Sequence, residues 1–299
     1  MDQPTHQLKP GALWPALLER TEHARRCGAI QSIPTTSELI EQDGVAFQVR
    51  LVTALAKKAE VRAASPHHNP FLPYDPDLFV ADLSPTHVAL LNKFNVVEHH
   101  LLIVTRAFEE QETLLTRQDC EALLVGLAEI DGLGFYNAGP VAGASQSHKH
   151  LQIIPLTEAP DGRLPIEPLM STVRSNATIG TVPGLPFLHA AAPFNPQWLD
   201  RGRDNVISFH ACYRALLDVT GLSIEPLRDG LERCGPYNLL ATRRWLLLVP
   251  RSEEYFEGIS INALGFAGAL LVKDTTQLAV LRSHGPMTAL RHVARPWLS

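Results

Sequence analysis

Two histidines and a glutamine at alternate positions are the residues of this sequence best suited to chemistry. They are His148, His150 and Gln152, within the run GASQSHKHLQIIPL at 143–156. From Leu151 onward the run has the apolar, β-branched composition of a strand, which we extend back through His148. Alternate residues of a strand share a face, so the two histidines and the glutamine line one face and the residues between them line the other.

Three kinds of chemistry could use such a face. A metal site could take ligands from His148 and His150, but it needs three or four donors, usually including a carboxylate or a thiolate, and Gln152 is a poor ligand. The histidines could also be structural and held by hydrogen bonds alone. In the third possibility, a neutral imidazole attacks phosphorus while neighbouring donors stabilise the phosphate oxygens. The whole group, entered through a Gly-Ala-Ser turn, favours this nucleophilic chemistry.

The run resembles the signature of the histidine triad (HIT) superfamily, in the transferase branch where His-x-His-x-Gln replaces the His-x-His-x-His of the hydrolases. Two further segments keep their order along the chain, LNKFNVVEHHLLIVTRAFEEQ at 91–111 and YNLLATRRWLLLVPRS at 237–252. With them, the chain is similar to the ATP adenylyltransferases, which are diadenosine tetraphosphate (Ap4A) phosphorylases. This resemblance implies a nucleotidyltransferase with a HIT-like α+β fold, in which helices flank an antiparallel sheet.

The resemblance also implies a mechanism. His150 is the expected nucleophile, which attacks the α-phosphorus and carries the adenylyl group, and His148 orients groups nearby. Gln152, Ser145 and the backbone amides of the turn at 143–146 would hold the phosphate oxygens. Phosphate would then attack the adenylyl-histidine, so that Ap4A and phosphate give ATP and ADP in a reversible reaction.

Further residues are expected to contact the substrate. They are Lys57, Asn92, Lys93, Asn137, Gly143, Ala144, Ser145, Gln146, Ser260 and Asn262. The sequence does not separate Lys57 from its neighbour Lys58. No carboxylate cluster surrounds the histidine motif, so we expect no metal ligands from the protein and no organic cofactor, with Mg²⁺ arriving as the counterion of the nucleotide.

Composition limits the class of protein. The chain has 299 residues, of which 45% are hydrophobic, and can bury a large core. Its formal net charge of −5 gives no general attraction to nucleic acid or to an acidic membrane. The partners that the resemblance implies are diadenosine polyphosphates, ATP, ADP and phosphate. The four cysteines lack the spacing of a zinc or redox motif. No apolar run reaches ~18 residues, and we expect a cytoplasmic protein.

Periodicity and turn residues divide the chain into an N-terminal part at 1–155, a crossover loop at 156–205 and a C-terminal part at 206–299. The resemblance implies that the first part is HIT-like and carries the motif and that the last, the ATP adenylyltransferase part, completes the nucleotide site. The first part is predicted to contain helices at 11–26 and 116–130 and strands at 46–52, 77–83, 87–94, 99–105 and 132–137. The last part is predicted to contain a helix at 206–219, strands at 237–242 and 245–249, and a helix at 277–293 interrupted at Pro286. Antiparallel strands around one helix indicate an α+β meander.

Two alternative functions stay open. The His-x-His-x-Gln motif also occurs in uridylyltransferases that act on hexose phosphates, although the segments at 91–111 and 237–252 argue against that branch. The other alternative is a protein that binds dinucleoside polyphosphates without turnover, which an intact His150 makes weaker. A proline-rich loop at 65–74, SPHHNPFLPY, either borders the pocket or is a rigid connector.

Overall fold

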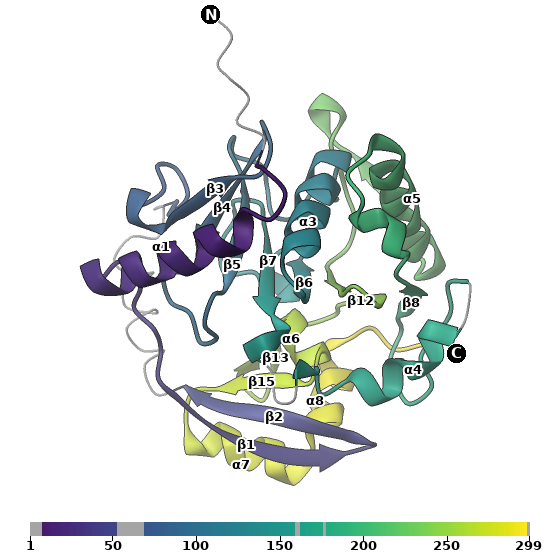
Figure 1. Cartoon of the computed structure of the whole chain (residues 1–299). Helices are drawn as coiled ribbons and strands as arrows, with labels where there is room; N and C mark the ends of the chain where they lie inside the picture. The colour runs from purple at the N-terminus through teal and green to yellow at the C-terminus, as the bar shows by residue number, and fades with distance from the viewer. Residues whose placement is uncertain (1–7, 53–68, 159–161, 176–177, 298–299) are drawn as a thin grey trace, which may run out of the picture.

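An antiparallel sheet of eight strands forms the centre of the protein (Figure 1). The computed structural model describes residues 8–52, 69–158, 162–175 and 178–297. In spatial order the strands are β3 (Phe79–Asp82), β4 (His87–Leu91), β5 (Leu101–Thr105), β7 (His150–Pro155), β6 (Gly132–Asn137), β11 (Tyr237–Ala241), β12 (Trp245–Pro250) and β8 (Ala190–Pro193). Every neighbouring pair is antiparallel, which confirms the predicted α+β class.

Three helices cover one face of this sheet: α1 (Leu13–Cys27), α3 (Arg117–Glu129) and α5 (Arg203–Val219) (Figure 1). Helix α3 begins at a capping box, because the Thr116 hydroxyl accepts from the Asp119 amide and the Asp119 carboxylate accepts from the Thr116 amide. Leu151 and Ile153 of β7 belong to the same buried apolar cluster as the inner residues of α3. Because Leu151 and Ile153 face the helices, the alternate residues His150 and Gln152 lie on the opposite face of β7.

A second apolar core lies on the other face of β6, β11 and β12. It contains residues of the helices α4 (Glu167–Ser175), α6 (Ala263–Phe266), α7 (Thr275–His284) and α8 (Pro286–Val293). A three-stranded sheet completes it, in the order β1 (Thr35–Gln42), β2 (Val45–Val52) and β15 (Ala269–Val272). Strand β15 runs parallel to β2, so a strand from the C-terminal region extends an N-terminal hairpin.

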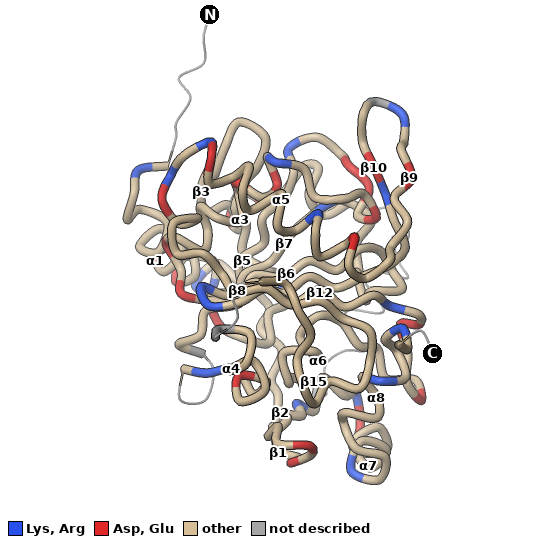
Figure 2. Tube along the Cα trace, turned by 90° about the vertical axis from the view of Figure 1, so that its right-hand side faces the viewer, with Lys and Arg blue, Asp and Glu red and all other residues tan. Residues whose placement is uncertain are grey.

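The remaining elements are short. They are η1 (Pro76–Leu78), η2 (Pro140–Ala142), η3 (Leu156–Glu158), η5 (Pro196–Leu199) and η6 (Arg228–Gly230), with two ribbons, β9 (Glu225–Pro226) with β10 (Glu232–Arg233) and β13 (Tyr255–Phe256) with β14 (Ile259–Ser260). Figure 2 shows basic and acidic positions interspersed along the outer loops and helices, whereas the central strands are mostly uncharged. Among the helices of the described ranges, none has the length and apolar character needed to cross a membrane.

The structure corrects two of the sequence predictions. The segment 156–205 is not a loop, because it contains α4 and also β8, which forms an edge of the central sheet. The many prolines and glycines of this segment interrupt its apolar periodicity, so neither element was predicted from the sequence. Strand β7 begins at His150 rather than His148, and His148 pairs with Glu110 only through an isolated bridge. The break at Pro286 is confirmed, since α7 ends at His284 and α8 begins at Pro286. The division into parts at 155 and 206 stays a prediction.

Candidate active site

The ring of His150 is held in one tautomer. Its Nδ1 lies 2.9 Å from the backbone carbonyl oxygen of His148, and because a carbonyl can only accept, Nδ1 carries the proton. Nε2 then carries the lone pair. The backbone of His150 is clamped by one side chain: its amide donates to Gln111 Oε1 at 2.7 Å, and its carbonyl accepts from Gln111 Nε2 at 3.1 Å. A neutral imidazole with this tautomer is the form that can attack phosphorus.

The ring of His148 is also held in one tautomer, but hydrogen bonds to the protein occupy both of its nitrogens. The Phe71 amide donates to Asn69 Oδ1 at 2.9 Å, so Asn69 Nδ2 is the donor to His148 Nδ1, also at 2.9 Å. His148 Nε2 therefore carries the proton and donates to the Thr105 carbonyl at 2.8 Å. Burial lowers the pKa of His148, and the hydrogen bond to Thr105 opposes this in part. The ring is neutral at pH 7, and both its nitrogens are used within the protein.

A chain of hydrogen bonds fixes the orientation of Gln152. It starts at the Phe94 amide, which donates to Asn92 Oδ1 at 3.2 Å, so that Asn92 Nδ2 is the donor to His100 Nδ1 at 3.1 Å. His100 Nε2 then donates to Gln152 Oε1 at 2.9 Å. Because the oxygen of Gln152 is accepting, the amide nitrogen is the end of the group available to donate to a phosphate oxygen. Asn92, which was expected to contact substrate, instead acts here through His100 and Gln152.

Aromatic rings surround the two histidines. The Phe71 ring centroid lies 5.5 Å from that of His148 and 5.4 Å from that of His150, and Phe108 lies 5.4 Å from His148. Since Asn69 and Phe71 belong to the proline-rich loop, the described part of that loop borders the motif, as one of its two interpretations predicted. These contacts make the surroundings apolar, which strengthens hydrogen bonds to a bound phosphate.

The turn before the motif meets the C-terminal part of the chain at Gly143. This residue has φ +85°, and a Cβ added to it would lie 2.7 Å from Asn262 Cβ and 2.9 Å from the Ile261 carbonyl oxygen. Only glycine fits both the conformation and the space. The structure therefore brings together the predicted positions 143 and 262, which are far apart in the sequence. The Asn262 side chain also caps α6 by accepting from the Leu264 amide at 3.0 Å.

Arg251 holds this junction and was not singled out from the sequence. Its guanidinium is buried, and its donors bond to the Ala142 carbonyl at 3.3 Å, Asn238 Oδ1 at 2.6 Å and the Ile261 carbonyl at 2.8 Å, with further bonds to the carbonyls of Glu253 and Val293. Burial lowers the pKa of Arg251 to about 9, and Glu254 opposes this shift. The group stays charged at neutral pH, where it links the residue before Gly143 to the residue before Asn262.

Lys149, between the two histidines, points to the opposite face as the alternation predicted. Its ammonium is fully buried and lies 2.7 Å from Asp119 Oδ2 and 3.1 Å from Glu109 Oε2. Asp119 also accepts from His87 Nε2 at 2.9 Å. Burial works against ionisation of Asp119, but the hydrogen bond from His87 and the charge of Lys149 outweigh it and hold the pKa of the carboxyl well below its ordinary value.

The other residues predicted to contact the substrate differ in burial and in their hydrogen-bond partners. Lys57 and Lys58 lie outside the described residues. Asn137 is buried, and its Oδ1 accepts from Asn238 Nδ2 at 2.8 Å and from the Ala263 amide at 3.0 Å, so it supports the Gly143 junction. Ser260 is exposed and donates to Glu254 Oε1 at 2.7 Å. Three predicted contact residues, Ala144, Ser145 and Gln146, are half-buried in the turn before the motif. Lys93 is half-buried next to Asn92.

A large hollow of about 1490 Å³ lies elsewhere, on the helical side of the sheet. It is lined by residues of α3, η5 and α5, such as Arg117, Trp198 and Arg203, and by none of the motif residues. The hollow and the histidine motif are therefore separate features. The chemistry of the donors, rather than the size of a cavity, identifies the motif face as the candidate active site.

The fold and the site together define a nucleotidyltransferase. Residues 3–172 match the Ap4A phosphorylase N-terminal domain, and residues 183–296 match the ATP adenylyltransferase C-terminal domain. The chain belongs to the Ap4A phosphorylase family, which confirms the resemblance seen in the sequence.

Two relatives illustrate the similarity. The chain is 30% identical over 249 residues to diadenosine 5',5'''-P1,P4-tetraphosphate phosphorylase 2 of Saccharomyces cerevisiae, with 75% of each protein covered. The crystal structure of yeast Ap4A phosphorylase Apa2 matches with a TM-score of 0.78 at 26% identity, covering 95% of this chain and 97% of that one. A structure of Apa2 in complex with Ap4A matches over the same shares at the same identity, with a TM-score of 0.76.

Proposed function

We propose that this protein cleaves Ap4A with phosphate to give ATP and ADP, through an adenylyl group carried on His150. The observation that carries the proposal is the bond from His150 Nδ1 to the His148 carbonyl, because it places the lone pair on Nε2. Family membership and the yeast relatives support the choice of substrate. Both yeast relatives are Ap4A phosphorylases, so the comparisons favour Ap4A as the substrate.

The first step forms a bond between His150 Nε2 and the α-phosphorus and breaks the phosphoanhydride bond, so that ATP leaves. No proton has to be removed from Nε2 beforehand. The positive charge that develops on the ring is shared with Nδ1, whose proton is held by the His148 carbonyl. Gln152 Nε2 and the amides of the turn at 143–146 would hold the phosphate oxygens as their charge shifts. In the second step a phosphate oxygen attacks, the P–N bond breaks and ADP forms.

Gln152 also determines which nucleophile completes the reaction. A carboxamide donates and accepts hydrogen bonds, but it cannot remove a proton near neutral pH. Water is a weak nucleophile and gains from a base, whereas phosphate is already an anion and needs a docking site, for which the half-buried Lys93 is a candidate. Two displacements at the same phosphorus predict ping-pong kinetics and overall retention of configuration.

The decisive experiment incubates the protein with Ap4A and labelled phosphate and separates the nucleotides. We expect label in ADP and none in ATP, and little turnover when phosphate is omitted. Equal rates without phosphate, with AMP and ATP as products, would identify a hydrolase. Tight binding without turnover would identify a binding protein, and turnover of a uridine diphosphate hexose but not Ap4A would identify a uridylyltransferase. The His150→Ala variant is the control for contaminating activity.

The proposal also covers the metal ion, the other partners and the location of the protein. Mg²⁺ arrives with the nucleotide, and no organic cofactor takes part. Phosphate, ATP and ADP are the other partners, with no nucleic acid and no membrane involved. The cytoplasmic location also stays a prediction. Omitting Mg²⁺ from the phosphorolysis assay and titrating it back tests the role of the ion directly.

A further inference from the structure

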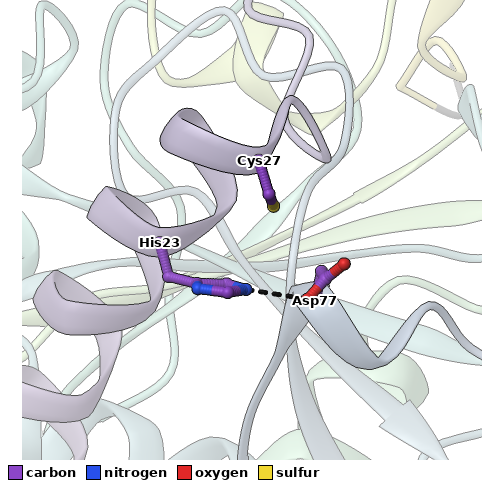
Figure 3. A group of neighbouring side chains, drawn as sticks. All are labelled: His23, Cys27 and Asp77. Atoms are coloured by element: carbon purple, nitrogen blue, oxygen red, sulfur yellow. Dashed lines mark hydrogen bonds and ion pairs between the residues drawn. The ribbon is translucent and has the colours of Figure 1, made fainter.

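Three different ligand types meet on the surface away from the histidine motif. His23 and Cys27 belong to α1, and Asp77 belongs to η1 (Figure 3). The spacing of four residues places His23 and Cys27 on the same side of the helix, one turn apart. Their potential ligand atoms, with a carboxylate oxygen of Asp77, all lie within 4.8 Å of one another. An imidazole, a thiol and a carboxylate thus converge on one point.

These three side chains make only weak, solvent-exposed interactions with the protein in the structure. His23 Nε2 lies 2.7 Å from Asp77 Oδ1, and the two side chains are 40% and 49% exposed. Cys27 Sγ makes a long hydrogen bond of 3.7 Å to the Ala24 carbonyl, and the residue is exposed. A hydrated ion can therefore approach from solvent. No buried structure has to open before it binds.

Neighbouring charges do not oppose a cation at this point. The two arginines of the last turn of α1 already have acidic partners: Arg25 lies 2.9 Å from Glu98, and Arg26 lies 3.8 Å from Glu22. The charges closest to a bound ion are then negative. They are the carboxylate of Asp77 and the thiolate of Cys27, whose thiol loses its proton when a metal binds.

We propose that His23, Cys27 and Asp77 form a zinc site with three protein ligands and a fourth position open to water. A thiolate, an imidazole and a carboxylate are the donors that Zn²⁺ accepts at about 2.0–2.3 Å. Two ligands of one tetrahedral ion at these distances lie about 3.3–3.8 Å apart. The His23–Asp77 pair must therefore separate slightly as their hydrogen bond is replaced by two bonds to the metal. The cysteine proton is released to solvent in the same step.

The proposed ion links parts of the chain that are distant in sequence. His23 and Asp77 are 54 positions apart, and η1 leads directly into the edge strand β3. A zinc ion at this point therefore fastens α1 to the edge of the sheet. Because it binds the folded arrangement, it raises the free energy of unfolding in proportion to its occupancy. The role is structural, and it does not depend on the proposed phosphorolysis.

Titration of the full-length, metal-free protein with Co²⁺, followed by displacement with Zn²⁺, tests the site. Cobalt bound by a thiolate gives a charge-transfer absorption band, which histidines elsewhere in the chain do not produce. We expect this band at one equivalent of Co²⁺ in the wild type and its loss in Cys27→Ser. The affinity should fall at least about tenfold in His23→Ala and in Asp77→Asn. The matched controls Cys212→Ser and Cys234→Ser should keep the band.

Thermal unfolding provides a second measurement. Zinc should raise the Tm of the wild type and of both control variants, and it should leave the Tm of Cys27→Ser unchanged. In the presence of a chelator the wild type and Cys27→Ser should melt at similar temperatures, because Cys27 is exposed and makes no strong contact. The proposal is overturned if the wild type shows no thiolate band, if the band survives Cys27→Ser, or if it survives both His23→Ala and Asp77→Asn at unchanged affinity.

Discussion

At the scale of single residues, the chemistry depends on which ring nitrogen of each histidine carries its proton. In this site the backbone makes that choice. The His148 carbonyl fixes the tautomer of His150, and the Phe71 and Phe94 amides fix those of His148 and His100 through an intervening asparagine. Backbone groups cannot exchange donor and acceptor roles, so each chain of bonds has one consistent direction.

The first prediction separates the roles of the two motif histidines. His150→Ala should lower kcat by at least about 10³-fold, because it removes the proposed nucleophile. His148→Ala should keep measurable activity, since that ring supports the site through Asn69 and Thr105. Steady-state phosphorolysis and trapping of labelled adenylyl-enzyme by an alkaline denaturing quench, which preserves the P–N bond, would measure both. Trapped adenylyl-enzyme in His150→Ala would contradict the assignment of the nucleophile.

The second prediction concerns the chain that orients Gln152. Gln152→Ala should reduce kcat by about 10²-fold or more, as expected for loss of a preorganised donor. His100→Ala should reduce kcat less, with little change in KM, because it acts through Gln152. In a double-mutant cycle the two effects should fail to add, with a coupling of about 0.5–3 kcal/mol. Additive effects would mean that His100 acts independently of Gln152.

At the scale of elements, the strand β7 carries two different functions on its two faces. One face presents His150 and Gln152, and the other buries Leu151 and Ile153 against α3. Lys149 precedes the strand and bonds to Asp119 in the first turn of α3. A single turn of α3 thus anchors the backbone between the two histidines, so that disturbance on the buried face would shift the catalytic face.

The third prediction tests this anchor. Asp119→Asn should lower the free energy of unfolding by about 3–5 kcal/mol, because it leaves the buried Lys149 ammonium without its nearest countercharge. Glu98→Gln, which breaks the exposed pair with Arg25, is the matched control and should cost less than about 1 kcal/mol. Urea unfolding at pH 7 measures both. A cost for Asp119→Asn no larger than that of the control would show that the buried pair contributes little.

The same carboxylate gives a pH dependence with a definite sign. The pKa of Asp119 in the folded protein lies below its ordinary value of 3.8. Its contribution is therefore fully present above about pH 5 and is lost as the pH falls below that range toward the folded pKa. The wild type should lose stability on acidification, and Asp119→Asn should lose less over the same interval. Parallel pH profiles for the two proteins would exclude Asp119 as a source of the acid sensitivity.

At the scale of the whole molecule, residues from both parts of the chain build one site. Strand β6 from the first part pairs with β11 from the second, and Asn137 at the end of β6 bonds to Asn238. Arg251 then ties the carbonyl of Ala142 to that of Ile261. The turn at 143–146 is therefore positioned by the C-terminal part, although the histidines that follow it belong to the N-terminal part.

The fourth prediction compares two glycines that both have a positive φ. Gly143 has φ +85° and touches Asn262, whereas Gly44 has φ +78° with nothing within 4 Å of an added Cβ. Gly44→Ala should cost about 1 kcal/mol of stability from backbone strain alone and leave activity unchanged. Gly143→Ala should cost more and also lower kcat/KM, because it displaces the turn from the C-terminal part. Urea unfolding and phosphorolysis assays measure the two effects.

Equal stability losses in the two alanine variants, with full activity in Gly143→Ala, would contradict the proposed contact. They would show that the turn tolerates displacement from Asn262. A loss of activity in Gly44→Ala would instead indicate that strain in the β1–β2 turn reaches the site by another route.

Features that depend on local residue pattern were predictable without the structure. Apolar periodicity indicated α1, α3 and α5 and the strands of the central sheet other than β8, and the alternation of side chains around His150 placed Lys149 opposite the histidines. The motif, with two further segments, indicated the family and the nucleophile. These features follow from neighbours within a few residues, which is the range over which side-chain spacing and turn chemistry act.

Contacts between residues far apart in the chain became visible only in the folded protein. No local pattern predicts that Thr105 and His100 orient the motif, that Asn69 of the proline-rich loop bonds to His148, or that Arg251 joins the Gly143 turn to the segment before Asn262. Strand β8 and helix α4 were also missed, because their segment is rich in proline and glycine and only packing against β12 gives it regular form. Hydrogen bonds between residues remote in sequence depend on the packing of whole elements, which local periodicity does not encode.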